Sequence, residues 1–337
     1  MEKSRSSSRQ WFRMLFWALL TGGLVVAGLF VMAWIGSSSL DPAARSRLLL
    51  QGRAHSFLEL SEGVVHYRDE GDRDAPAFVL VHGLSTPSWV WDDHIAPMVA
   101  AGYRVVSFDN YGRGWSDRPR GPYDIDRTDR LMVELLEALE IRGPIHLVGY
   151  SMGGAVAAVF ASRRSELIES LVLIAPAGIE PVESRAVDLL RLPGLGDWLI
   201  AVFGNAIFLD AQARDAEVLD DPDAFLARFE AQMEFEGYAR ALLSTLRHYP
   251  LLEGMADIYR AVGREGIRTL AVFGERDEIV PEAHAQALAR LIPEAEIVLL
   301  PDLNHALTYS HPALVNDEIL GHARGAGDSG APGRAGN

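Results

Sequence analysis

The sequence contains no cysteine, and this absence excludes several kinds of protein at once. A disulfide scaffold, a thiolate metal site, a cysteine nucleophile and a lipid-modified cysteine all require the missing side chain. Basic residues are also scarce, with 31 Lys and Arg against 46 Asp and Glu, for a net charge of −15. Because the first 40 residues are basic on balance, the remainder is more acidic still. We therefore expect no nucleic-acid partner.

An uncharged segment near the N-terminus, residues 14–35, is long enough to cross a membrane. As a helix it would extend ~33 Å at ~1.5 Å per residue. Trp11, Trp17 and Trp34 lie near its ends, and four basic residues precede it. This pattern predicts a single-pass signal-anchor, with a cytoplasmic N-terminus and the rest of the chain on the far, extracytoplasmic side. The alternatives are a buried core helix and a cleaved signal peptide, which would make the protein secreted.

Beyond residue 40, short apolar runs alternate with helical patterns. Strands are predicted at 57–60, 64–70, 77–82, 104–108, 145–149, 171–175, 269–273 and 296–300, and helices at 126–140, 152–164 and 281–291. The first two runs read as a hairpin, and the others are apolar enough to be buried on both faces of a parallel sheet. The sequence therefore predicts an α/β fold with a mostly parallel central sheet flanked by helices.

One interval, residues 179–250, contains no strand-like run and predicts a helical cap inserted into the α/β core. Phe225, Phe229 and Met233 recur at every fourth position within it, which favours the core of the insertion over a binding face. The predicted organisation is a tail and membrane anchor over 1–40, a core over 41–178 and 251–322, the cap over 179–250, and a disordered tail over 323–337.

The strongest chemical signal follows the predicted strand 145–149. Gly149-Tyr150-Ser151-Met152-Gly153 is a G-x-S-x-G motif, and it leads directly into a helix rich in Ala and Val. In a strand–turn–helix context, this motif holds the serine exposed at the carboxyl edge of the sheet. The two glycines leave room for neighbouring backbone to pass closely. Ser151 is therefore the candidate nucleophile.

A serine hydroxyl needs a base to accept its proton and a carboxylate to orient that base. Of the ten histidines, His305 is the candidate because it follows the last predicted strand, at the edge where Ser151 emerges. Asp277, Glu275 and Glu278 all follow the strand 269–273 and fit the chain order serine, acid, histidine. Position alone does not separate these three carboxylates.

The tetrahedral intermediate of acyl transfer needs backbone N–H donors directed at its oxyanion. The N–H of Met152, at the start of the helix after Ser151, is one candidate. The N–H of Leu84, in the loop after the strand 77–82, is the other. His82 in the same loop is interpreted as a loop-stabilising residue.

These motifs together resemble the α/β-hydrolase superfamily, over residues from about 57 to 320. The resemblance rests on Val81-His82-Gly83-Leu84, residues 109–116, Gly149-Tyr150-Ser151-Met152-Gly153-Gly154, residues 273–277 and Asn304-His305. It implies a Ser151–His305–Asp277 triad, an oxyanion hole from Leu84 and Met152, and a helical cap over the site. The anchor and the Ser-Met-Gly-Gly sequence are also similar to membrane-attached monoacylglycerol lipases and related esterases.

The resemblance implies a membrane-anchored serine esterase or lipase whose partner is a small ester with an apolar acyl chain. Neither a cofactor nor a metal is expected. Relatives that open epoxides or remove halide carry aspartate where this chain has Ser151. Carbon–carbon bond hydrolases of the same fold, and a non-catalytic ligand-binding protein, remain open alternatives.

Overall fold

The computed structural model describes residues 38–49 and 55–325, and scattered positions between residues 11 and 28. The predicted membrane segment 14–35 therefore lies mostly outside the described residues, as does the predicted tail after residue 325. Among the described residues, no single helix combines the length and apolar character needed to cross a bilayer. One sharply bent pair, Arg185–Arg191 with Leu195–Ala216, meets that requirement only when its two helices are taken together.

The core of the molecule is one sheet of eight strands in the order β1-β2-β4-β3-β5-β6-β7-β8. Strand β1 pairs antiparallel with β2, and β2 pairs antiparallel with β4; all later pairs are parallel. This confirms the predicted mostly parallel sheet. The strands are β1 Ser56–Leu60, β2 Gly63–Glu70, β3 Ala77–Val81, β4 Arg104–Phe108, β5 Ile145–Tyr150, β6 Ile168–Ile174, β7 Thr269–Gly274 and β8 Glu296–Leu300.

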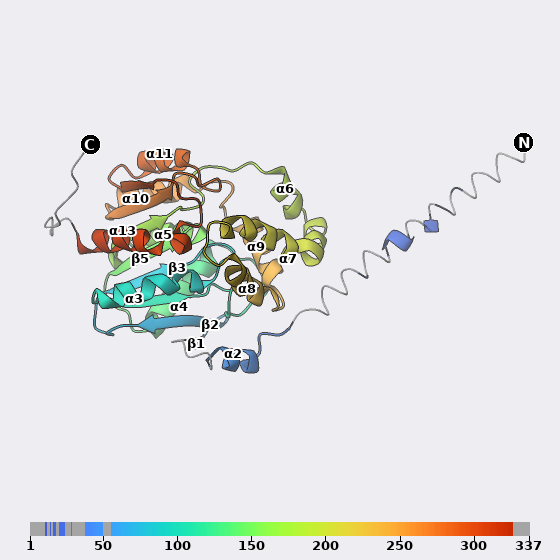
Figure 1. The fold of residues 1–337 in the computed structure, drawn as a ribbon, viewed down its shortest axis with the longest axis horizontal. Helices are drawn as coiled ribbons and strands as arrows, with labels where there is room; N and C mark the ends of the chain where they lie inside the picture. Colours follow the sequence, from blue (N-terminus) through green and yellow to red (C-terminus); the bar gives the residue numbers. More distant parts are fainter. Residues whose placement is uncertain are drawn as a thin grey trace, which may run out of the picture.

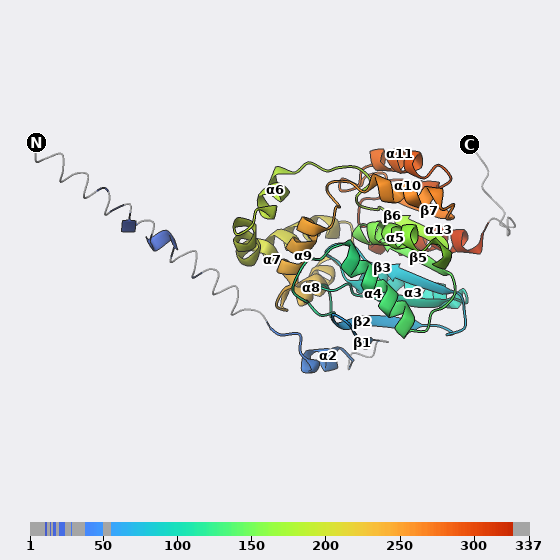
Figure 2. The same cartoon turned by 180° about the vertical axis from the view of Figure 1, so that it is seen from behind.

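Helices cover both faces of the sheet and bury its central strands on both sides. Every residue of β3, β4 and β5 is buried, which is typical of parallel strands between two helical layers. Helices α3 and α13 lie on one face (Figure 1), and α4, α5 and α10 lie on the other (Figure 2). The helices outside the insertion are α2 Pro42–Leu49, α3 Asp92–Ala100, α4 Ile125–Ala138, α5 Met152–Arg163, α10 Ala256–Arg264, α11 Glu282–Leu291, α12 Leu307–Ser310 and α13 Pro312–Arg324.

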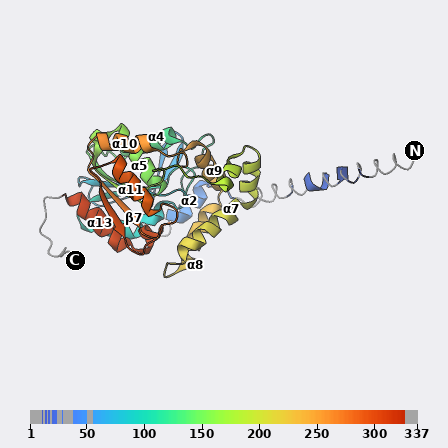
Figure 3. The same cartoon turned by 90° about the horizontal axis from the view of Figure 1, so that it is seen from above.

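Four helices between β6 and α10 form the predicted helical insertion, which lies at the end of the molecule opposite α13 (Figure 3). They are α6 Arg185–Arg191, α7 Leu195–Ala216, α8 Pro222–Met233 and α9 Tyr238–His248. Phe229 and Met233 are buried in a separate apolar cluster of this cap, as their spacing predicted, whereas Phe225 lies outside that cluster and stacks on Tyr309. The sharp bend before α7 needs glycine at position 196, because a Cβ there would lie 1.6 Å from the carbonyl oxygen of Leu190.

Two glycine-to-alanine substitutions inside helices are expected to change stability in opposite directions. In Gly153→Ala, the new Cβ would lie 2.1 Å from the carbonyl oxygen of Val81, and we expect a loss of about 2 kcal/mol or more. In Gly321→Ala, the new Cβ meets nothing within 4 Å, and a gain of about 0.5–1 kcal/mol is expected. Urea unfolding of both variants measures the difference, and equal effects would contradict the close packing at Gly153.

Candidate active site

Ser151 lies in the turn between β5 and α5, with a backbone conformation that L-residues rarely adopt. Its φ is +54° and its ψ is −119°. A hydrogen bond to the neighbouring strand β6 holds the turn in place: the Ser151 N–H donates to the carbonyl of Ile174 at 2.8 Å. A Cβ on Gly149 would lie 2.2 Å from the carbonyl oxygen of Gly153. The strained conformation is therefore fixed by contacts that only glycine permits, and it directs the serine hydroxyl away from the sheet.

His305 follows β8 and contacts both other candidate catalytic side chains. Its Nε2 lies 3.0 Å from the Oγ of Ser151, and its Nδ1 lies 2.7 Å from the Oδ2 of Asp277. The hydroxyl of Tyr150, next to the serine, donates to the carbonyl oxygen of His305 at 2.8 Å. The structure therefore brings together Ser151, His305 and Asp277 at the carboxyl edge of the sheet.

Among the three carboxylates that follow β7, the structure places Asp277 against His305. Asp277 is buried, and its Oδ1 accepts hydrogen bonds from the N–H groups of Ile279 and Val280, each at 2.8 Å. These donors hold the carboxylate in one orientation and leave Oδ2 for the imidazole. Glu275 and Glu278 are exposed instead. Burial and backbone donors together distinguish the aspartate from its neighbours.

The two candidate oxyanion donors lie at the ends of adjacent strands. Val81 of β3 pairs with Gly149 of β5, and Leu84 and Met152 each follow this pair by three residues. Neither backbone N–H donates a hydrogen bond to any other residue that the structure describes. Both donors are therefore free to bind an oxygen atom that is attached to the carbon attacked by Ser151.

His82 supports this loop as a neutral imidazole rather than taking part in proton transfer. Its Nδ1 donates to the carbonyl of Gly83 at 2.8 Å, and its Nε2 accepts from the N–H of Asn110 at 2.9 Å. Complete burial lowers the pKa of the His82 imidazole to about 4. A protonated ring would place an N–H against the Asn110 N–H, so the loop geometry depends on the neutral form.

Buried hydrogen bonds join the cap to the loop after β3, which carries Leu84. Arg113 donates from Nε to the carbonyl of Leu84 at 2.9 Å and from Nη2 to the hydroxyl of Thr245 in α9 at 2.8 Å. The carbonyl of Ser85 accepts from Gln232 at 2.8 Å and from Tyr238 at 3.2 Å. The cap therefore fixes the loop that carries one of the two candidate oxyanion donors.

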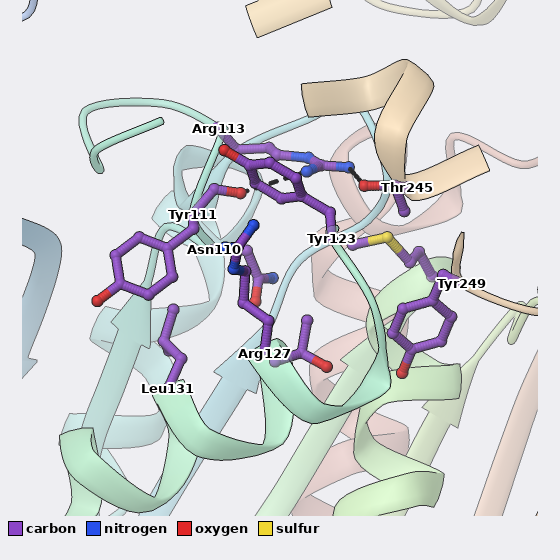
Figure 4. Close-up of a pocket in the computed structure, with 10 residues that line it drawn as sticks. Asn110, Tyr111, Arg113, Tyr123, Arg127, Leu131, Thr245 and Tyr249 are labelled. Carbon is purple, nitrogen blue, oxygen red and sulfur yellow. Dashed lines mark hydrogen bonds between the residues drawn. The ribbon is translucent and has the colours of Figure 1, made fainter. Parts of the chain in front are cut away.

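A small cavity, lined in part by Met152, is too small to hold an ester substrate. Figure 4 shows Arg113, Tyr123, Arg127 and Tyr249 around it, and its volume is about 10 Å³. That is room for roughly one water molecule. Burial lowers the pKa of the Arg113 guanidinium to about 10, and its charge is spread over carbonyl, hydroxyl and ring contacts.

The cap also brings to the site an acidic side chain that the sequence does not predict there. Asp215, near the end of α7, lies beside Tyr309 and interacts electrostatically with His305 and Asp277. Burial, reinforced by the charge of Asp277, raises the pKa of the Asp215 carboxyl. Nothing in the helical pattern of α7 distinguishes Asp215 from its exposed neighbour Asp210. The two aspartates differ only in where the folded cap places them: Asp215 lies at the site and Asp210 is exposed.

Comparison with known proteins places this site within a large family. A model of the alpha/beta hydrolase family matches residues 78–318, and the chain therefore belongs to the α/β-hydrolase family. The AB hydrolase superfamily protein YfhM of Bacillus subtilis is 27% identical over 287 residues, which cover 80% of this chain and 98% of that protein. The putative carbamate hydrolase RutD of Stutzerimonas stutzeri is 31% identical over 268 residues, covering 77% and 96%.

A solved structure supports the same fold. The thermophilic esterase from Thermogutta terrifontis matches with a TM-score of 0.67 at 22% identity, covering 81% of this chain and 98% of that chain. The predicted superfamily is thus confirmed. Within the described residues, no group of three or more His, Asp or Glu side chains could hold a metal ion.

We expect the free energy of unfolding to fall as the pH falls from about 6.5 towards 4, partly because of His82. In that window the unfolded state binds a proton at this imidazole and the native state does not, so acid favours unfolding. The full contribution is roughly 3 kcal/mol, at ~1.36 kcal/mol per pKa unit. Urea titrations between pH 4 and 7 measure it. In His82→Gln the stability curve should be shallower, and a parallel curve would contradict the assignment.

Proposed function

We propose that the protein is a serine hydrolase of the carboxylesterase or lipase type, which cleaves carboxylic esters through an acyl-enzyme on Ser151. The observation that supports this most strongly is the chain of contacts from Ser151 through His305 to Asp277. When Oγ attacks the ester carbonyl, the Nε2 of His305 takes its proton. Asp277 stabilises the imidazolium that forms.

The remaining steps use the same groups. The oxyanion of the tetrahedral intermediate accepts hydrogen bonds from the N–H groups of Leu84 and Met152. As the intermediate collapses, His305 gives its proton to the departing alcohol oxygen, and the acyl group stays on Ser151. Water then attacks the acyl-enzyme, with His305 again as the base, and the carboxylic acid leaves as Ser151 regains its proton.

The side chains that the cap brings near the site favour a lipid-like ester such as an acylglycerol. The ring of Phe225 in α8 stacks on Tyr309 with centroids 4.9 Å apart, and it also contacts Trp89. Leu84 and Trp89 pack against the apolar cluster of the cap. These apolar surfaces suit an acyl chain. We also propose that residues 14–35 hold this site at a membrane, on its extracytoplasmic side.

Replacement of the serine tests the proposed reaction directly. In Ser151→Ala, turnover of p-nitrophenyl esters should fall by about 10⁴-fold or more, as for other triad serines, and labelling by a fluorophosphonate should be lost. Esters of graded chain length report the preferred acyl group. The control is Ser162→Ala, because Ser162 lies in the same helix α5 and its hydroxyl donates to the carbonyl of Val159.

Each failure of this test has a separate meaning. If the folded wild-type protein neither hydrolyses esters nor reacts with the fluorophosphonate, it is not a serine hydrolase and the proposal is wrong. If Ser151 reacts with the fluorophosphonate but no ester of any length is cleaved, the proposed ester substrate is wrong. A carbon–carbon bond hydrolase of the same fold is then the better-supported function.

The Asp215 carboxylate is expected to disfavour esters that carry a negative charge near the reacting carbonyl. In Asp215→Asn, kcat/KM for a p-nitrophenyl hemiglutarate should rise about 5- to 30-fold relative to p-nitrophenyl butyrate, from roughly 1–2 kcal/mol of lost repulsion. The measurement is made at pH 8. Asp210→Asn removes the same charge from the exposed side of α7 and is the control. Equal changes in both variants would refute a local effect of Asp215.

A further inference from the structure

The outer side of the cap carries an apolar surface that the fold of the cap itself does not cover. We define the α6–α7 surface by six side chains, each between 41% and 49% exposed: Val182, Leu189, Leu192, Leu195, Phe203 and Ile207. Elsewhere in residues 38–49 and 55–325, large exposed apolar side chains are scattered over separate elements, such as Ile279 and Leu314. Contiguous exposed apolar groups mark interaction sites more often than single ones do.

The pattern along α7 shows that this exposure belongs to one face of the helix. Leu195, Phe203 and Ile207 are separated by multiples of four residues and therefore form a stripe. Gly196, Ile200 and Gly204 form a neighbouring stripe that is buried, and α7 packs there against the rest of the cap. Helix α7 therefore lies along the surface of the molecule, with one apolar stripe covered and the other exposed.

Helix α7 does not have the surroundings of a membrane-spanning helix. It packs on both α8 and α9, and Asp197 in its first turn pairs with Arg247 of α9 at 2.8 Å. It is also joined to α6 by a sharp bend at residues 192–194, and Gly196 in its first turn packs closely against Leu190. A helix that is bound to the protein along one side and apolar along another is suited to lie in the plane of a membrane interface.

The path of the chain before the catalytic domain indicates which partner this surface faces. Ser38 is bound to the turn between α8 and α9, since its N–H donates to Glu234 at 2.8 Å and its carbonyl accepts from Glu236 at 2.9 Å. Both helices at this turn contact α7. Only two residues separate Ser38 from Ile35, the last residue of the predicted membrane segment. This connection spans at most about 11 Å, at ~3.6 Å per residue.

A second contact prevents the domain from turning freely about this connection. Arg45 in α2 pairs with Asp117 at 2.5 Å, and Ala44 and Leu48 of the same helix are buried. The segment 38–49 is thus fixed to the catalytic domain at two places. If residues 14–35 cross a bilayer, the cap is held beside that bilayer.

We propose that the α6–α7 surface binds the surface of the lipid bilayer into which residues 14–35 insert. The C-terminal end of helix α7 lies at the site. Gln212 contacts the hydroxyl of Ser85 at 3.4 Å, and Asp215 lies beside Tyr309. Helix α7 therefore joins the α6–α7 surface to the catalytic edge of the sheet. The consequence for the substrate, delivery of an ester from the membrane to Ser151, rests on the proposed function.

The absence of native cysteine allows a direct test with single-cysteine variants of the full chain. Leu192→Cys and Phe203→Cys are labelled with an environment-sensitive fluorophore in phosphatidylcholine vesicles. Leu314→Cys, on α13 at the opposite end of the molecule, is the control, because Leu314 is 48% exposed (Figure 3). We expect quenching by doxyl-labelled lipids to be about twofold or more stronger at the two cap positions, because only these enter the interface. Equal quenching at all three positions would overturn the proposal.

A second measurement separates docking from catalysis. In the double variant Leu192→Asp, Phe203→Asp, hydrolysis of a long-chain ester within the vesicles should fall about tenfold, because charged side chains are expelled from the interface. Hydrolysis of soluble p-nitrophenyl acetate should stay unchanged. Unchanged hydrolysis of both esters would contradict docking. If the wild-type protein cleaves neither ester, the proposed function fails, and the quenching measurement alone decides whether the cap binds the bilayer.

Discussion

The close backbone packing around Ser151 is the constraint on which the rest of the site depends. Gly149 and Gly153 lie where a Cβ would collide with backbone carbonyl groups, and this contact fixes the turn that carries the serine at φ +54°. The other parallel strands of the sheet then determine which residues lie around the serine. The loops after β3, β7 and β8 all leave the same edge of the sheet, bringing Leu84, Asp277 and His305 to one place.

The cap does more than cover the site, because hydrogen bonds join it to the loop after β3. The loop after β3 is held from the cap side through Arg113, Gln232 and Tyr238. The buried neutral His82 holds the same loop from the core side. A loop fixed from both sides keeps its candidate donor, the N–H of Leu84, in place before a substrate arrives, and such preorganisation stabilises an oxyanion. We therefore expect sequence changes in the cap to affect the reaction proposed at Ser151.

The sequence predicts the sheet and the serine turn because both depend on local signals. Strands buried on two faces are continuous apolar runs, and the turn needs glycine at fixed positions next to Ser151. The choice of Asp277 over Glu275 and Glu278 could not be made from position, since it depends on burial and on two backbone donors. The placement of Asp215 could not be predicted either, because it follows from how α7 crosses the site.

The most direct test of the central claim is a crystal structure of the full chain after reaction with a p-nitrophenyl alkylphosphonate. We expect phosphorus bonded to the Oγ of Ser151, with the phosphoryl oxygen about 2.7–3.1 Å from the N–H groups of Leu84 and Met152. The alkyl chain should lie against the apolar side chains of the cap. Phosphonate bonded to another residue, or a phosphoryl oxygen directed away from both N–H groups, would contradict the proposed roles of Ser151, Leu84 and Met152.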